Sequence, residues 1–149
     1  GHEIGTHSNT HPDMAKISAE ESMAELYRSC EYIEKAGGGK PKLFRAPSGS
    51  YSSELIKTAS ETGFTTIQWD VDSRDWKDKT AGEMVESVTK NVSKGSIILF
   101  HSGKENTIEA LPQILEILKN GGYDFVKVSD LIYKENYTID HTGRQFSLK

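Results

Sequence analysis

The sequence predicts an α/β protein in which strands and helices alternate around a parallel sheet. Two observations support this prediction: short apolar runs recur along the chain, and longer amphipathic segments with recognisable helix caps lie between them. A complete barrel of eight strand–helix units needs about 250 residues, whereas this chain has 149. The length therefore predicts about five units, which form either a small open sheet or a part of a barrel.

Four helices are predicted from their caps and from apolar residues at helical spacing. The first and third follow capping boxes at residues 18–21 and 80–83, in which a Ser or Thr is followed three residues later by Glu. The second begins at Ser52 or Ser53, and the fourth covers about residues 108–120. Glycines, which tolerate a left-handed turn, follow the first, second and fourth helices.

Short runs between these helices predict the strands of the sheet. The predicted strands are residues 42–45, 65–69, 96–100 and 125–128, with a weaker one before His7. After Leu131 the periodicity is weak, so residues 132–149 are expected to form a C-terminal tail that wraps the surface.

The composition excludes several classes of partner. The chain has 35% hydrophobic and 27% charged residues, a net charge of -4, and its Lys and Arg residues form no cluster. Nucleic acid is therefore not an expected partner, because phosphate binding needs a concentrated basic patch. The longest apolar run, residues 97–100, is far shorter than the ~20 residues of a membrane span. The chain is therefore not expected to be transmembrane, and its single cysteine, Cys30, excludes a disulfide within the chain.

Four loops that follow predicted strands carry most of the residues able to do chemistry. In parallel α/β folds, ligands bind at these strand ends. The first loop holds His7 and His11, which would meet on one face of a helical turn and could share a divalent metal. Imidazole ligands suit zinc, iron, cobalt or nickel better than magnesium or calcium. Taken alone, this spacing is more often a pair of solvated loop histidines.

The second loop, residues 44–51, could bind an anion. Arg45 ends a strand and could hold a carboxylate with two parallel hydrogen bonds. Pro47 stiffens the loop, Gly49 lets the backbone approach a ligand closely, and backbone N–H groups there could stabilise an oxyanion. The alternative is an ordinary turn with an exposed arginine.

The third and fourth loops add carboxylates, tryptophans and a histidine. Residues 69–76 contain three Asp and two Trp, and tryptophan faces often stack on sugar rings. Capping aspartates and core tryptophans are an equally good interpretation. His101 directly follows a buried run, where it could act as a general acid or base, although an isolated histidine there is more often structural.

The order of these motifs resembles the NodB-homology polysaccharide deacetylases, carbohydrate esterase family 4. The sequence contains H-S-x-x-H, R-x-P-x-G, D-x-x-D-W and L-x-H in the order of motifs two to five of that family, over about residues 1–130. Residues 136–143 are similar to sporulation-type members from clostridia and bacilli. The resemblance implies a distorted (β/α) barrel, of which residues 1–149 would be the C-terminal part of a single domain.

The resemblance also implies roles for individual residues. His7 and His11 match the two metal histidines, with zinc expected first and cobalt, nickel or iron as alternatives. His101 matches the general acid, and either Asp72 or Asp75 matches the group that tunes it. The remaining matches are Arg45, which would orient the catalytic base; the backbone N–H of Ser48, which would bind the oxyanion; and Gly49, Tyr51 and Trp76, which would contact the substrate.

The function implied is metal-dependent hydrolysis of N-acetyl groups from an N-acetylglucosamine polysaccharide, peptidoglycan or chitin-like, with release of acetate. Family members of this type imply an extracytoplasmic location, secreted or associated with the cell wall or spore envelope of a Gram-positive bacterium. The T-F-D-D-G run of the first family motif does not occur in the sequence. The chain is therefore expected to be a fragment, nearly inactive alone, whose partner is an N-terminal segment on a separate chain. The alternative is a catalytically inactive metal- or glycan-binding pseudoenzyme.

Overall fold

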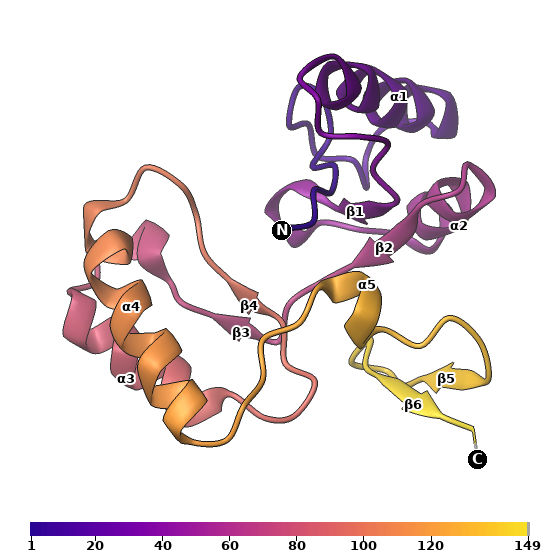
Figure 1. Ribbon diagram of the computed structural model, residues 1–149. Helices are drawn as coiled ribbons and strands as arrows, with labels where there is room; N and C mark the ends of the chain where they lie inside the picture. The colour runs from indigo at the N-terminus through magenta and orange to yellow at the C-terminus, as the bar shows by residue number, and fades with distance from the viewer. Residues whose placement is uncertain (149) are drawn as a thin grey trace. The chain divides into compact units, whose positions relative to one another are not determined.

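The computed structural model describes residues 1–148 and confirms the expected alternation of strands and helices (Figure 1). The chain divides into two compact units, Gly1–Gln68 and Trp69–Lys149. Among the described residues, no helix combines the length and the apolar character needed to cross a membrane.

The first unit places two helices beside a short parallel sheet. Its elements are α1 (Ala19–Lys35), β1 (Leu43–Arg45), the 3-10 turn η1 (Pro47–Gly49), α2 (Ser53–Glu61) and β2 (Thr65–Ile67). β1 pairs in parallel with β2, and Thr6 forms a further parallel bridge with Phe44. The weak strand predicted before His7 is thus confirmed as a single bridge, which places that histidine at the carboxyl end of the sheet next to the end of β1.

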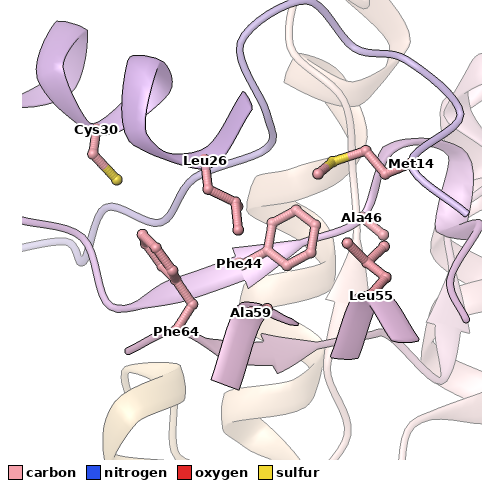
Figure 2. Packing of buried hydrophobic residues seen from close by; sticks show 8 residues of the cluster. All are labelled: Met14, Leu26, Cys30, Phe44, Ala46, Leu55, Ala59 and Phe64. Carbon is pink, nitrogen blue, oxygen red and sulfur yellow. The ribbon is translucent and has the colours of Figure 1, made fainter. Parts of the chain in front are cut away.

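The capping box at Ser18 explains why α1 begins where it does. The Glu21 backbone N–H donates to Ser18 Oγ at 3.2 Å, and the Ser18 backbone N–H donates to the Glu21 carboxylate at 2.9 Å. The apolar face of α1 then packs on β1 and α2 (Figure 2). The core of this unit consists of Met14, Leu26, Cys30, Phe44, Ala46, Leu55, Ala59 and Phe64.

The second unit also has a short parallel pair of strands with two helices, and it adds a third helix and an antiparallel pair of strands. Its elements are β3 (Val71–Asp72), the 3-10 turn η2 (Asp75–Lys77), α3 (Ala81–Asn91), β4 (Ile98–Leu99), α4 (Glu105–Asn120), α5 (Val128–Leu131), β5 (Tyr137–Ile139) and β6 (Gln145–Ser147). β3 and β4 pair in parallel, and α3 packs against α4 and β3. The predicted capping box of α3 is confirmed, because Thr80 and Glu83 bond reciprocally. The core consists of Val71, Ala81, Met84, Val88, Ala110, Ile114 and Leu118.

Two sequence predictions about this unit were wrong, and one strand was missed. Residues 125–128 do not form a strand: the segment is irregular up to Val128, where α5 begins. Its two large apolar side chains, Phe125 and Val126, are 52% and 57% exposed, and no described strand pairs with it, so the β-forming residues have no ladder to join. α4 begins at Glu105 rather than at about residue 108. β3 was not predicted, because Asp70 and Asp72 give its short run a polar character.

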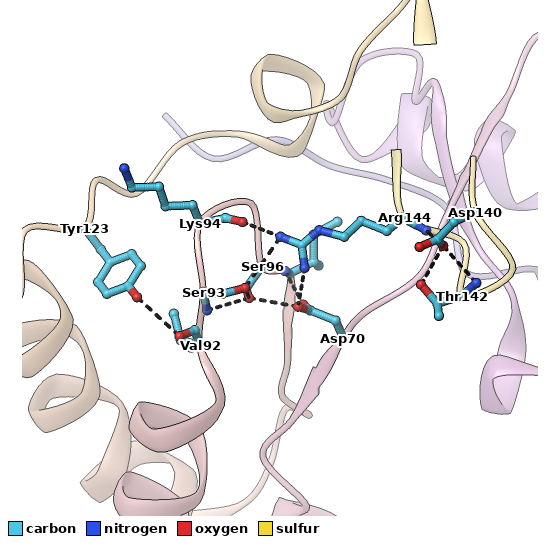
Figure 3. A network of polar contacts seen from close by, with 10 residues as sticks. Asp70, Val92, Ser93, Lys94, Ser96, Tyr123, Asp140, Thr142 and Arg144 are labelled. Atoms are coloured by element: carbon cyan, nitrogen blue, oxygen red, sulfur yellow. Dashed lines mark hydrogen bonds and ion pairs between the residues drawn. The ribbon is translucent and has the colours of Figure 1, made fainter. Parts of the chain in front are cut away.

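The tail beyond Leu131 contains a β-hairpin that the weak periodicity did not predict. β5 and β6 pair antiparallel, and the Asp140 carboxylate holds the turn by accepting from the backbone N–H groups of Thr142 and Arg144. The Arg144 guanidinium donates to the Lys94 carbonyl and lies 3.8 Å from an oxygen of Asp70 (Figure 3). The hairpin is thereby attached to the loop between α3 and β4.

Truncation of Phe44 tests the core of the first unit. Its ring is fully buried at the centre of the cluster, so Phe44→Ala should lower the free energy of unfolding by about 3–5 kcal/mol, the usual cost of such a cavity. Urea unfolding followed by far-UV circular dichroism measures this. Tyr32→Ala is the control, because Tyr32 is 65% exposed on α1 and should change stability by less than about 0.5 kcal/mol. Equal effects of the two substitutions would contradict the assigned core.

Candidate functional site

The first histidine pair lies in an irregular loop, not in a helical turn as the spacing suggested. Ser8 and His11 both adopt left-handed backbone conformations, with φ of 70° and 59°, and the His11 N–H donates to Ser8 Oγ at 3.0 Å. The resulting bend brings the His7 and His11 rings to a centroid separation of 5.1 Å in an edge-to-face arrangement. The two imidazoles are thus close neighbours, as predicted. An irregular bend brings them together, however, and not the predicted helical turn.

A backbone carbonyl fixes the protonation pattern of His7. Its Nδ1 lies 2.6 Å from the carbonyl oxygen of Arg45. Because a carbonyl can only accept a hydrogen bond, Nδ1 must carry the proton, and the neutral ring then has its lone pair on Nε2. This is the arrangement found in most metal-binding histidines, whose second ring nitrogen donates to a carbonyl or a carboxylate.

The turn after β1 is built from residues held in unusual backbone conformations. Ser48 has φ 55° and ψ 14°, and Gly49 has φ 66°; the Gly49 N–H donates to the Ala46 carbonyl at 3.1 Å. A left-handed non-glycine residue costs of order 1–3 kcal/mol, and such strain concentrates at ligand-binding sites. Ser48 is exposed, and Tyr51, two residues beyond Gly49, is 49% exposed.

Arg45 connects the histidine pair to this turn. Its backbone carbonyl accepts from His7, and its backbone N–H donates to the Thr6 carbonyl at 3.0 Å. The guanidinium is partly buried, and burial lowers the pKa of Arg45, although an arginine remains charged near neutral pH. A partly desolvated cation at a strand end could hold a carboxylate or another anion.

In the second unit, a buried carboxylate holds His101. One oxygen of Asp75 lies 2.7 Å from His101 Nδ1, and the other accepts from the His101 backbone N–H at 2.6 Å and from Thr107 Oγ1 at 3.0 Å. The Asp75 side chain is fully buried, whereas that of His101 is 40% exposed. His101 Nδ1 therefore donates to the carboxylate, and Nε2 is the ring nitrogen that this contact leaves available.

The pKa of Asp75 reflects two opposed effects. Burial alone raises the pKa of this carboxyl, but the hydrogen bonds from the His101 backbone, the His101 ring and Thr107 outweigh burial, so the net pKa is lowered. The charged carboxylate is thus the stable form in the folded protein.

Asp72, the alternative partner of His101 in the sequence prediction, makes different contacts. Its carboxylate accepts from the Arg74 backbone N–H at 2.8 Å and from the Trp76 indole at 3.3 Å. Trp76 is 49% exposed, and the Lys77 ammonium lies 4.6 Å from its ring centroid. Asp72 therefore orients an exposed aromatic surface, and Asp75 is the aspartate that contacts the histidine.

The predicted site residues fall into two groups. The first unit contains His7, His11, Arg45, Ser48, Gly49 and Tyr51, and the second contains Asp72, Asp75, Trp76 and His101. The expectation that both groups line a single cleft stays a prediction. His7 and His11 offer two nitrogen ligands of the kind that zinc prefers, and no third His, Cys, Asp or Glu joins them within the described residues. The donors fit two positions of a metal site, and water or other groups would fill the rest.

Two polar residues near the site were missed by sequence reasoning. Thr107 of α4 donates to Asp75, and Glu25 of α1 accepts hydrogen bonds from the loop that joins the two histidines. Both residues are polar and lie on helices, where they look like ordinary solvent-facing positions. Burial of Thr107, which is 7% exposed, emerges only from the packing of α4.

Comparison with known proteins identifies relatives over most of the chain. A family model for polysaccharide deacetylase matches residues 1–67. A peptidoglycan-N-acetylglucosamine deacetylase of Bacillus cereus is 37% identical over 137 residues, which cover 89% of this chain and 64% of that protein. The chain spans about half the length of the curated relatives it matches, for example 41% and 49% of two other Bacillus proteins.

Solved structures give the same picture. A family 4 carbohydrate esterase from Streptomyces lividans, in complex with acetate, has a TM-score of 0.78 and 31% identity, covering 99% of this chain and 71% of that one. A CE4 family pseudoenzyme from Bacillus anthracis has a TM-score of 0.83 and 35% identity, covering 87% of this chain and 46% of that one.

Substitution of Asp75 by Asn tests the buried pair through the pH dependence of stability. Because the folded pKa lies below the unfolded one, the carboxylate contributes stability that is present above pH ~3.9 and is lost as pH falls through the lower folded value. Asp75→Asn should therefore be less stable than the wild type at pH 7, by about 1–3 kcal/mol, and the difference should shrink below pH ~4. Urea unfolding at a series of pH values measures both effects.

The control for this experiment is Asp124→Asn, because Asp124 is exposed and outside these contacts. This control should leave stability nearly unchanged across the pH range. A wild type and an Asp75→Asn variant whose stabilities run parallel down to pH 2 would show that the carboxylate is not held as its contacts indicate.

Proposed function

Because the chain belongs to the polysaccharide deacetylase family, carbohydrate esterase family 4, we propose that it supplies catalytic residues for removing N-acetyl groups from an N-acetylglucosamine polysaccharide. The observation that carries the proposal is the pairing of half-exposed His101 with the buried carboxylate of Asp75. A histidine held in this way is a general acid for the leaving amine. Named deacetylases among the relatives act on peptidoglycan, which makes cell-wall glycan the proposed substrate, with a chitin-like polymer as the alternative.

His7 and His11 are the proposed metal ligands. The Arg45 carbonyl holds His7 Nδ1, so Nε2 is the nitrogen that would bind the ion, which we expect to be zinc, with cobalt, nickel or iron as alternatives. When bound, such an ion polarises a carbonyl and lowers the pKa of its water. In this role the two histidines fix the place where an acetamide carbonyl is hydrolysed.

His101 is the proposed proton donor. Asp75 keeps Nδ1–H of the ring occupied, so the proton that leaves must come from Nε2. After water has added to the acetamide carbonyl, transfer of this proton to the amine nitrogen lets the C–N bond break, which releases acetate and leaves a free amine on the sugar. The hydrogen bond from Thr107 to Asp75 at 3.0 Å keeps the carboxylate aligned with the ring during this transfer.

The other predicted residues are proposed to bind substrate or anionic groups. Arg45 would orient a catalytic carboxylate, and the backbone at Ser48 and Gly49 would stabilise the oxyanion of the tetrahedral intermediate. Exposed Tyr51 and Trp76 offer apolar faces to sugar rings. A protein with this substrate works outside the cytoplasm, at the cell wall or spore envelope, which is the location we propose.

A second candidate function is that of a glycan- or metal-binding pseudoenzyme. Two observations favour it: a chain 35% identical to this one belongs to a CE4 family pseudoenzyme, and the described residues provide only two ligands of a metal site. A pseudoenzyme would still need His7 and His11 for metal binding, but the proton donor His101 would have no reaction to serve.

Activity of the intact protein separates these two functions. With zinc or cobalt present, the wild type should release acetate from N-acetylglucosamine oligomers or from peptidoglycan. His101→Gln should lower the rate by about 10²–10⁴-fold, the usual contribution of a general acid, while metal affinity stays unchanged. His141→Gln is the matched control, because His141 is an exposed histidine in the tail and its substitution should leave acetate release unaltered.

Two results would contradict the proposed deacetylase function or the proposed role of His101. An intact wild-type protein, assayed together with any N-terminal segment that belongs to it, that binds zinc but releases no acetate from either substrate would establish the pseudoenzyme instead. Equal acetate release by the wild type and by His101→Gln would remove His101 from the mechanism.

A further inference from the structure

We propose that Glu25 is a positioning residue that sets the geometry of the His7–His11 pair. Its carboxylate reaches from α1 to the loop between the histidines and accepts three hydrogen bonds there. The donors are the Asn9 N–H at 2.8 Å, the Thr10 N–H at 2.7 Å and the Thr10 hydroxyl at 2.8 Å. The part of this inference that concerns metal binding rests on the proposed function; the part that concerns the loop does not.

The loop needs an external support because its backbone is strained. Ser8 and His11 both lie in the left-handed region, at a cost of order 1–3 kcal/mol each. The bend turns two consecutive N–H groups, those of Asn9 and Thr10, toward the same point, and such concave backbone arrangements bind anions. The Glu25 carboxylate occupies that point. Without the Glu25 carboxylate, the Asn9 and Thr10 N–H groups would lose their acceptor. The hydrogen bonds that offset the strain of the bend would then be missing.

Side chains of helix α1 form hydrogen bonds with the chain on both sides of His7. Glu25 and Ser29 are four residues apart, so they lie on the same face of the helix. Ser29 Oγ accepts from the Thr6 hydroxyl at 2.7 Å in a buried position, immediately before His7, while Glu25 holds Asn9 and Thr10 immediately after it. Between them lies Leu26, which is fully buried in the core. The same helix, α1, therefore packs in the core and supports the loop that carries His7 and His11.

Glu25 is assigned as a positioning residue and not as a metal ligand. Three donors already occupy its two oxygens, and within residues 1–148 no group of three metal-ligating side chains includes it. Its contribution passes through the loop: by fixing residues 9 and 10, it fixes the bend that brings the His11 ring to 5.1 Å from the His7 ring.

The test uses Glu25→Ala and Glu25→Gln in the intact protein. The first readout is the exchange protection of the Asn9 and Thr10 amides by NMR, and the second is the affinity for zinc by calorimetry. Glu25→Ala should abolish the protection and weaken zinc binding by about 10–100-fold, as observed when the supports of metal ligands are removed. Glu25→Gln keeps one carbonyl oxygen for the two backbone donors, so it should restore most of both signals. If Glu25→Ala fails to fold, Glu25→Gln must still show a partial loss of amide protection and of zinc affinity.

Glu31→Ala is the matched control, because Glu31 is an exposed glutamate on the same helix whose ion pair with Lys35 is 4.0 Å long. This variant should behave as the wild type. Unchanged zinc affinity and unchanged amide protection in Glu25→Ala, with a zinc-binding wild type, would overturn the inference while leaving the metal site intact. A wild type that binds no zinc, with amide protection that still depends on Glu25, would uphold Glu25 as the support of the loop and reject the proposed metal function.

Discussion

The buried carboxylate of Asp75 is the constraint on which the proposed chemistry of the second unit depends. Removing a charge from water costs several kcal/mol unless partners replace the lost hydration, and this carboxylate has His101 and Thr107 as its partners. The short turn that carries it is bounded by left-handed residues, Arg74 and Asp78, with φ of 56° and 51°. The hydrogen bonds of Asp75 offset that strain. They also fix His101, at the end of β4, relative to the turn that follows β3.

The same principle recurs in the first unit with different residues. There the carbonyl of Arg45 occupies His7 Nδ1, as Asp75 occupies His101 Nδ1, and Glu25 compensates the strained loop that carries His11. In each unit an acceptor on a neighbouring element therefore occupies Nδ1 of a histidine and leaves Nε2 available. For the proposed function this preorganisation matters, because groups that are already held need no rearrangement when a substrate binds.

The sequence predicted the features whose signals are local. The capping box at Ser18 located α1 within a residue, and the motif order led to the family, which the structural similarities confirm. Features that depend on distant partners were missed or left open. Residues 125–128 have the composition of a strand but no described strand to pair with, and the choice between Asp72 and Asp75 required the position of His101. Thr107 gave no signal, because its burial depends on how α4 packs.

The central claim is that Asp75 holds His101 as a proton donor with Nε2 outward. Long-range proton–nitrogen NMR spectra of the His101 ring in the intact protein test it most directly. We expect Nδ1 to remain protonated throughout a pH titration and Nε2 to be the nitrogen that gains and loses the proton, with this preference lost in Asp75→Asn. A neutral His101 protonated on Nε2 in the wild type, or a ring unaffected by the Asn substitution, would contradict the account.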